Sequence, residues 1–197
     1  LSAAFCEIEW TRRRRLLLVG CTILMLALQG VVSLRWGTGL ARYLYPLITH
    51  LPLWLLLAAM TRRALWPLVS VLTAYLCCQL RRWAALLVIA LFPVGGTVLQ
   101  DATELIVTLP ILLVLIRWIA PSVRALSRSP LLLQLQFGMI PLLSYLFDYF
   151  TRIYTDLLSS GNQAAVEFMP FVCSVAYLIF VFRLSEEQRA RTYLEQM

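Results

Sequence analysis

The sequence predicts an all-α membrane protein with six or seven transmembrane helices and a helical extension at its carboxyl end. The 197 residues are 61% hydrophobic and 14% charged, with a mean hydropathy of +0.81. Soluble domains average about 45–50% apolar and about 25% charged residues, so this composition excludes a water-soluble core. A hydrocarbon layer about 30 Å thick requires roughly 20 apolar residues per helix, and about five segments between Leu16 and Phe182 reach that length.

The first two predicted helices are separated by a glycine-interrupted turn. Leu16–Leu34 forms the first, because it is an apolar run bounded by Arg12–Arg15 and Arg35. The turn follows at Trp36–Gly39, since glycine adopts backbone conformations that end a helix. The second helix is expected over Tyr43–Met60.

The next two predicted helices are bounded by pairs of arginines. Ala64–Leu80 lies between Arg62–Arg63 and Arg81–Arg82, and this placement separates it from Trp83–Leu99. Arginine is expensive in a hydrocarbon layer, so each pair is expected at a membrane surface. Pro93 is expected to kink the end of the fourth helix.

Three further helices complete the predicted set. The fifth, Ala102–Ala120, is expected to end at Pro121. The sixth, Leu131–Leu158, would be roughly 40 Å long at 1.5 Å per residue, so its last turns should project into water. A turn at Ser159–Asn162 leads into the seventh, Ala164–Phe182.

The arginines leave two topologies open. Six crossings require Ala64–Leu80 to be re-entrant, which keeps the arginine pairs on both sides of it in the cytoplasm. Seven crossings place the amino terminus outside. The charge rule favours six crossings and the lengths of the segments favour seven. Both topologies put the carboxyl end in the cytoplasm and Ser159–Asn162 outside.

Several functional classes are disfavoured by the sequence. The net charge is +7, but all the basic residues are arginines placed mostly at helix ends, which indicates topology and anionic lipid rather than nucleic acid. The cysteines show no CxxC spacing, and His50 is a lone histidine, so no metal site is expected. There is no P-loop and no GxSxG or HExxH motif, so we expect neither catalytic residues nor a cofactor in this chain.

A polar and aromatic stripe marks the predicted outer end of the sixth helix. Asp148, Arg152 and Asp156 follow one another at four-residue spacing, so they share one helical face with the arginine between two carboxylates. One interpretation is an interfacial belt of charge-paired side chains, and the other is a site for an extracytoplasmic ligand. The candidate ligand-binding or signalling residues are Tyr145, Asp148, Tyr149, Arg152, Tyr154, Asp156, Asn162 and Glu167.

The chain divides into three parts by composition. Residues 1–15 are polar and basic, residues 16–182 form the membrane region, and residues 183–197 form a charged helical strip. Glu187 and Arg191 are an i, i+4 pair in the favourable order within that strip. The strip continues the last membrane helix without a helix breaker, so it is either the start of a cytoplasmic coiled-coil signalling linker or a juxtamembrane tail.

Four segments carry a resemblance to a known family. They are Thr73–Leu80, Pro141–Tyr149, Ile153–Asn162 and Val166–Cys173. Over about Leu51 to Leu194, the chain resembles the amino-terminal membrane region of sensor histidine kinases with a GHKL-type ATP-binding domain from Clostridia-like bacteria.

This resemblance implies a sensor or input domain in the bacterial cytoplasmic membrane. The kinase domain, with its ATP and Mg²⁺, would follow the strip, and the full-length protein would then be a histidine kinase. The implied partners are the lipid bilayer, a second copy in a homodimer, an extracytoplasmic ligand and a response regulator. The alternative function is a small-molecule membrane transporter or its substrate-binding subunit.

Overall fold

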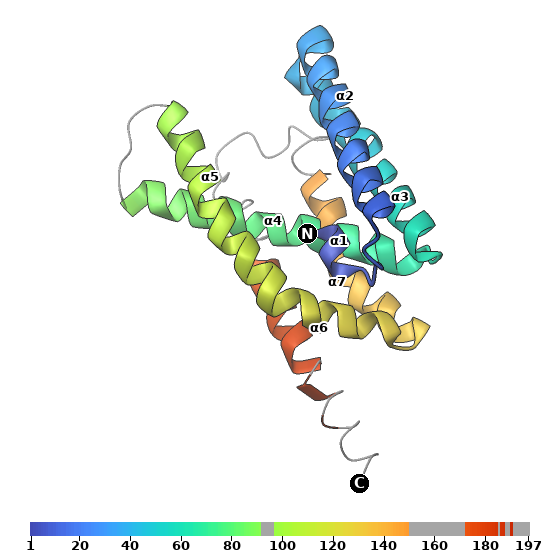
Figure 1. The fold of residues 1–197 in the computed structure, drawn as a ribbon. Coiled ribbons are helices and arrows are strands. Elements are labelled where there is room, and N and C mark those ends of the chain that lie inside the picture. Colours follow the sequence, from blue (N-terminus) through green and yellow to red (C-terminus); the bar gives the residue numbers. More distant parts are fainter. Residues whose placement is uncertain (92–96, 150–171, 185, 188–189, 191–197) are drawn as a thin grey trace.

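A computed structural model describes residues 1–91, 97–149, 172–184, 186–187 and 190 (Figure 1). Within these ranges every regular element is a helix, as the composition predicted. The elements are α1 (Ser2–Phe5), α2 (Arg12–Tyr45), the π-helical turn η1 (Pro46–His50), α3 (Leu51–Thr61), α4 (Leu65–Leu91), α5 (Thr97–Val114), the π-helical turn η2 (Leu115–Ile119), α6 (Ala120–Ala125), the 3-10 turn η3 (Leu126–Arg128), α7 (Leu131–Tyr149) and a helix at Val172–Leu184.

The elements α2, η1 and α3 form a helical hairpin. The chain reverses inside α2 at Gly37, whose φ of 88° and ψ of 162° lie outside the helical region. The two legs then run side by side, and the Thr49 hydroxyl donates a 3.2 Å hydrogen bond to Gln29 Oε1 across them. This reversal confirms the predicted glycine-interrupted turn. The second leg ends at Arg62, which closes α3 in a left-handed conformation.

Helix α4 is the centre of the fold, and the prediction of a break within it is wrong. It runs without interruption through Arg81–Arg82, which were expected to separate two helices. Neither glycine nor proline occurs between Leu68 and Leu91, so nothing interrupts its backbone hydrogen bonds. Whether Ala64–Leu80 crosses the membrane or is re-entrant stays a prediction. Helices α1, α3, α5 and α7 all pack against α4.

The expected helix end at Pro121 is also wrong. The chain widens into a π-helical turn, η2, in which the Ala120 N–H bonds to the Leu115 carbonyl. Pro121 then lies in the first turn of α6, a position at which a helix tolerates a residue without a backbone N–H. Helical structure therefore continues through α6 and η3 as far as Arg128.

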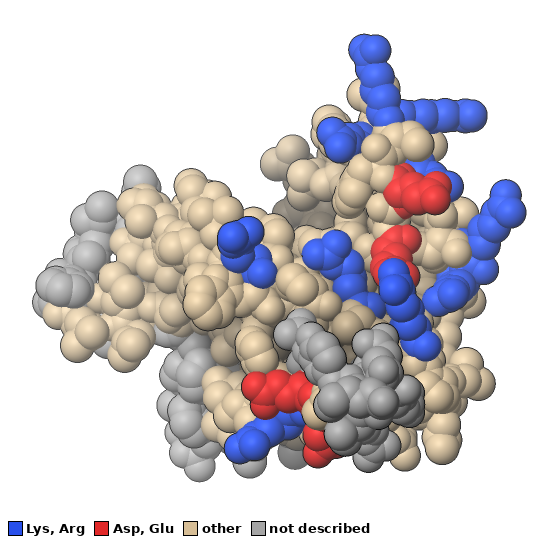
Figure 2. All heavy atoms as spheres, turned by 60° about the horizontal axis from the view of Figure 1, so that its bottom comes forward, with Lys and Arg blue, Asp and Glu red and all other residues tan. Residues whose placement is uncertain are grey.

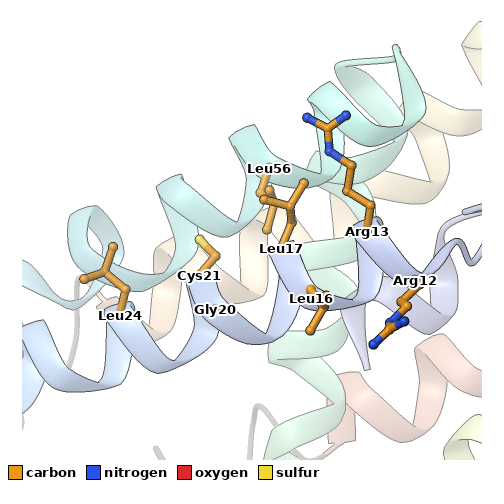
Figure 3. Close-up of a pocket in the computed structure, with 8 residues that line it drawn as sticks. All are labelled: Arg12, Arg13, Leu16, Leu17, Gly20, Cys21, Leu24 and Leu56. Atoms are coloured by element: carbon orange, nitrogen blue, oxygen red, sulfur yellow. The ribbon is translucent and has the colours of Figure 1, made fainter.

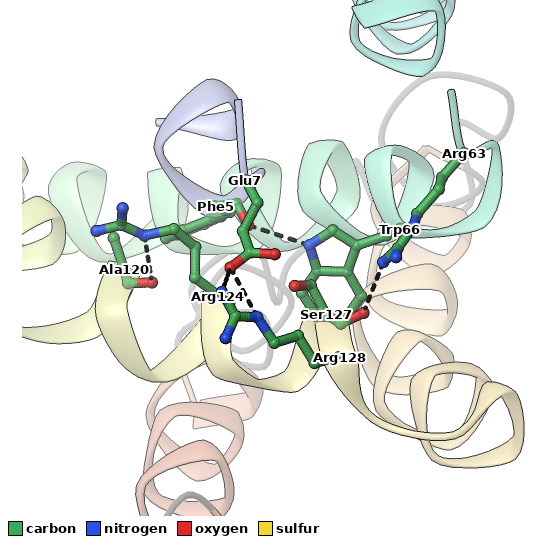
Figure 4. Close-up of polar contacts among 8 residues, drawn as sticks. All are labelled: Phe5, Glu7, Arg63, Trp66, Ala120, Arg124, Ser127 and Arg128. Carbon is green, nitrogen blue, oxygen red and sulfur yellow. Dashed lines mark hydrogen bonds and ion pairs between the residues drawn. The ribbon is translucent and has the colours of Figure 1, made fainter. Parts of the chain in front are cut away.

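Polar contacts fasten the amino-terminal segment to the start of α4 and to η3 (Figure 4). The Trp66 indole N–H donates a 3.0 Å hydrogen bond to the Phe5 carbonyl, and Phe5 itself is fully buried. Arg128 pairs with Glu7, with 2.9 Å between Arg128 Nε and Glu7 Oε1. The sequence predicted only a polar, basic segment here, whereas its first residues are part of the core.

Three described helical stretches are long and apolar enough to span a membrane, namely Arg12–Thr61, Leu105–Arg128 and Leu131–Tyr149. Two shorter apolar helices cover Leu65–Leu80 and Val172–Leu184. Most of the surface in Figure 2 is neither acidic nor basic, and its arginines gather on part of that face. Such helices are compatible with a membrane protein, because lipid tails tolerate an apolar outer surface that water does not.

Candidate functional site

A cluster of polar and aromatic side chains lies where the hairpin, α4 and α7 meet. On α7, Tyr145, Asp148 and Tyr149 are three and four residues apart and so share one helical face. On α4, Tyr75 and Gln79 are four residues apart and face them. We call the whole group the tyrosine–aspartate cluster, which consists of Tyr45, His50, Tyr75, Gln79, Tyr145, Asp148 and Tyr149.

The Asp148 carboxyl group is the buried centre of this cluster. Asp148 is only 5% exposed, and its Oδ2 accepts a hydrogen bond from the Tyr75 hydroxyl. Gln79 Nε2 donates to the same oxygen over 3.4 Å. Burying a carboxyl group is costly unless donors replace water, and here α4 supplies both donors. The carboxyl therefore ties α7 to the central helix.

His50 joins the hairpin to the same cluster. A 2.8 Å hydrogen bond links His50 Nδ1 to the Tyr145 hydroxyl. The imidazole ring meets the rings of Tyr45 and Tyr75 edge-on, with centroids 4.9 Å and 5.3 Å away. Edge-to-face packing at these separations is the favoured arrangement of aromatic rings. A small rotation of the hairpin would thus disturb contacts to both α4 and α7.

The other side of the same α4 turn holds the helix at Val172–Leu184. Thr73 Oγ1 and the Tyr177 hydroxyl lie 3.0 Å apart in a buried hydrogen bond. The Ser174 hydroxyl donates a 2.9 Å hydrogen bond to the Leu76 carbonyl. Thr73 and Leu76 flank Tyr75 along the chain, within about 4.5 Å of helix rise. One turn of α4 consequently contacts both the cluster and the last described helix.

An aromatic contact reinforces the packing between α7 and that last helix. The rings of Phe137 and Tyr177 have centroids 4.8 Å apart, and both side chains are buried. Trp66 of α4 stacks on Phe137 with a centroid separation of 6.2 Å. The three helices α4, α7 and Val172–Leu184 therefore share one interior.

Only part of the predicted site lies in the described structure. Tyr145, Asp148 and Tyr149 are brought together as one face of α7, but this face is directed at α4. The predicted pairing of Asp148 with its helical neighbours stays a prediction. The candidates outside the described residues are Arg152, Tyr154, Asp156, Asn162 and Glu167.

Sequence reasoning missed the partners that hold Asp148. Tyr75 and Gln79 carry a usable signal, since they are two polar groups at i, i+4 within an apolar segment. His50 carries no such signal, and its neighbours in the structure are tyrosines. Within the described residues, no group of three His, Cys, Asp or Glu side chains is arranged to hold a metal ion.

Comparison of the chain with protein-family models, curated proteins and solved structures gives no match in any of the three. The resemblance to sensor histidine kinases thus depends on its own segments. Two of these, Thr73–Leu80 and Pro141–Tyr149, contain every α4 and α7 member of the tyrosine–aspartate cluster. These two segments lie far apart in the sequence and meet at one site.

Proposed function

We propose that this chain is the membrane input domain of a bacterial two-component sensor histidine kinase, in which the tyrosine–aspartate cluster controls the last helix. The observation that carries the proposal is the double role of two successive turns of α4, from Thr73 to Gln79. Tyr75 and Gln79 hold Asp148, while Thr73 and Leu76 hold the helix at Val172–Leu184. This helix leads directly into the charged strip that would connect to a kinase domain.

The proposed mechanism is a shift between two packing arrangements. A ligand or membrane state that acts on the hairpin or on α7 changes the contacts of His50 or Asp148. The hydrogen bonds to α4 then reform with different partners, and α4 moves the last helix through Thr73 and Leu76. A signal can bias such an equilibrium only by interacting differently with the two arrangements. Buried, close-packed helices favour discrete alternatives over gradual deformation.

We further propose six membrane crossings with both ends in the cytoplasm. Each of six helical segments would cross once. They are the two hairpin legs, α4, the continuous stretch α5–η2–α6, α7 and the helix at Val172–Leu184. Support comes from the polar contacts that gather the arginine-rich ends of several elements, since Arg128 pairs with Glu7 and Arg63 donates to the Ser127 carbonyl over 3.2 Å. The positive-inside rule assigns this end to the cytoplasm. Figure 4 shows Arg63, Arg124 and Arg128 at this end. The proposal also assigns to it the start of α2, with Arg12, Arg13, Arg14 and Arg15, and the end of α3 at Arg62.

A transporter is the second candidate function, and the buried Asp148 is the observation that favours it. A carboxyl group among apolar helices is a typical coupling site for protons or cations. This alternative requires substrate flux across the membrane by the chain itself. The sensor proposal requires a downstream partner domain and does not require substrate flux.

The first test is the coding sequence after Met197. The sensor proposal expects a helical linker, a helix bearing a phosphoacceptor histidine, and an ATP-binding domain. In membrane vesicles that contain this full-length protein, we expect Asp148→Asn and Tyr75→Phe to change basal autophosphorylation at least about threefold. That change corresponds to about 0.6 kcal/mol of bias, well within the energy of one hydrogen bond.

The matched control is Gln136→Ala, because Gln136 is an exposed residue of α7 outside the cluster. It should leave autophosphorylation unchanged. A stop codon directly after Met197 would argue against the sensor proposal. Substrate uptake by vesicles of the 197-residue chain, lost in Asp148→Asn, would support the transporter instead.

A further inference from the structure

We propose that a groove on the helical hairpin binds an anionic phospholipid. Arg12 and Arg13 supply the positive charge that attracts the headgroup phosphate, and one acyl chain lies along the leucines that follow them (Figure 3). This inference does not depend on the proposed function, since it concerns a different surface. The tyrosine–aspartate cluster contributes no residue to the groove.

The groove has the length and lining that an acyl chain needs. Its volume is about 670 Å³, and it opens along one side of α2 next to Leu56 of α3. From Leu16 to Leu24 the helix rises about 12 Å, which is most of the roughly 15 Å depth of one leaflet. Leu16, Leu17 and Leu24 are all more than half exposed. The lining residues are Arg12, Arg13, Leu16, Leu17, Gly20, Cys21, Leu24 and Leu56.

Charge complementarity identifies the headgroup. Arg12 and Arg13 lie at one end of the groove and are exposed. The positive charge of the adjacent Arg14 is already paired, because its Nη1 lies 3.6 Å from a Glu9 carboxylate oxygen. In the part of the chain that the structure describes, no ion pair involves Arg12 or Arg13. The two side chains leave α2 toward opposite sides in Figure 3, so each presents its own guanidinium group at this end of the groove. Guanidinium groups bind phosphate oxygens, so this end suits an anionic headgroup.

The same features disfavour other occupants. A small soluble anion would leave the leucine lining exposed, and a neutral lipid would leave the two guanidinium groups without a counter-charge. A second copy of this chain, packed side by side in the same orientation, would bring two Arg12–Arg15 clusters together. Like charges at an interface oppose such pairing. An anionic phospholipid satisfies both ends of the groove at once.

Gly20 provides a way to close the groove without disturbing the fold. It lines the groove, and a Cβ built at Gly20 meets no atom within 4 Å. A leucine at this position therefore occupies the path of the acyl chain. Gly30 is the matched control, since it lies on the same hairpin leg, has the same free space, and does not line the groove.

The test is native mass spectrometry of the 197-residue chain in detergent, titrated with phosphatidylglycerol or with phosphatidylcholine of the same acyl chains. We expect phosphatidylglycerol to be retained preferentially. An arginine that contacts the headgroup contributes about fivefold in affinity, so Arg12→Gln with Arg13→Gln should weaken binding about 25-fold. Gly20→Leu should also weaken it, whereas Gly30→Leu and Arg15→Gln should stay within about twofold of the unchanged chain.

Three outcomes overturn the proposal. Equal retention of the two lipids removes the role of the arginines. Unchanged phosphatidylglycerol binding in Gly20→Leu removes the acyl chain from the groove. A dimer that dissociates in Gly20→Leu but not in Gly30→Leu assigns the groove to a second copy.

Discussion

The crossing of α4 and α7 at Gly138 predicts a sharp steric effect. A Cβ built on Gly138 would lie 2.7 Å from Val69 Cγ2, a distance that real Cβ atoms essentially never show. Val69 is 3% exposed, and its β-branched side chain has a strongly preferred rotamer in a helix, so this methyl group cannot move away freely. Gly138→Ala should therefore force the two helices apart at their closest approach.

The magnitude follows from two opposing terms. Overpacking a filled core costs about 1–3 kcal/mol. Replacing glycine by alanine inside a helix stabilises the folded state by about 0.5–1 kcal/mol. We expect Gly138→Ala to lower the free energy of unfolding by about 1–2 kcal/mol, which is roughly a tenfold change in the folding equilibrium.

The assay is reversible unfolding of the chain in mixed micelles with increasing dodecyl sulfate, followed by tryptophan fluorescence. Gly30→Ala is the control, since a Cβ there meets no atom within 4 Å and only the helix-propensity gain remains. Adding Val69→Ala to Gly138→Ala should recover about 1 kcal/mol relative to the sum of the single changes, because the clashing methyl is gone. Equal stability of Gly138→Ala and Gly30→Ala would refute the close approach.

Three further predictions concern the amino-terminal segment. Trp66→Phe removes the donor to the buried Phe5 carbonyl, so it should lower the free energy of unfolding by about 1–3 kcal/mol. It should also speed tryptic cleavage at Arg12–Arg15, as followed by mass spectrometry. Glu7→Gln breaks only the exposed ion pair with Arg128, so the unfolding midpoint should shift far less than in Trp66→Phe, and should not shift in 1 M salt. A shift as large as that of Trp66→Phe would contradict this prediction. Burial raises the pKa of the Cys6 thiol above its ordinary value, so the native protein should hold less thiolate there at any given pH. Alkylation of Cys6 should therefore stay slow when the pH reaches 9 and become fast on unfolding, and rapid alkylation of the native protein at pH 8 would contradict its burial.

The sequence by itself determined the class of structure and one of its turns. Hydropathy and length are local properties, so they predicted helices long enough to span a membrane, and Gly37 marked the reversal of the first hairpin. Local reasoning was wrong where charge or proline was taken as a helix end. Helix α4 continues through Arg81–Arg82, and a π-helical turn carries the chain past Pro121.

The tertiary structure alone decided which polar groups meet. Asp148 is held by Tyr75, 73 residues away, and Tyr145 bonds to His50, 95 residues away. No helical periodicity relates such positions, because a helix fixes only neighbours three or four residues apart. The burial of Asp148 and the position of its donors follow from the way α4 packs against α7. A sequence can state that a carboxyl group is costly among apolar helices, but only packing supplies the groups that offset this cost.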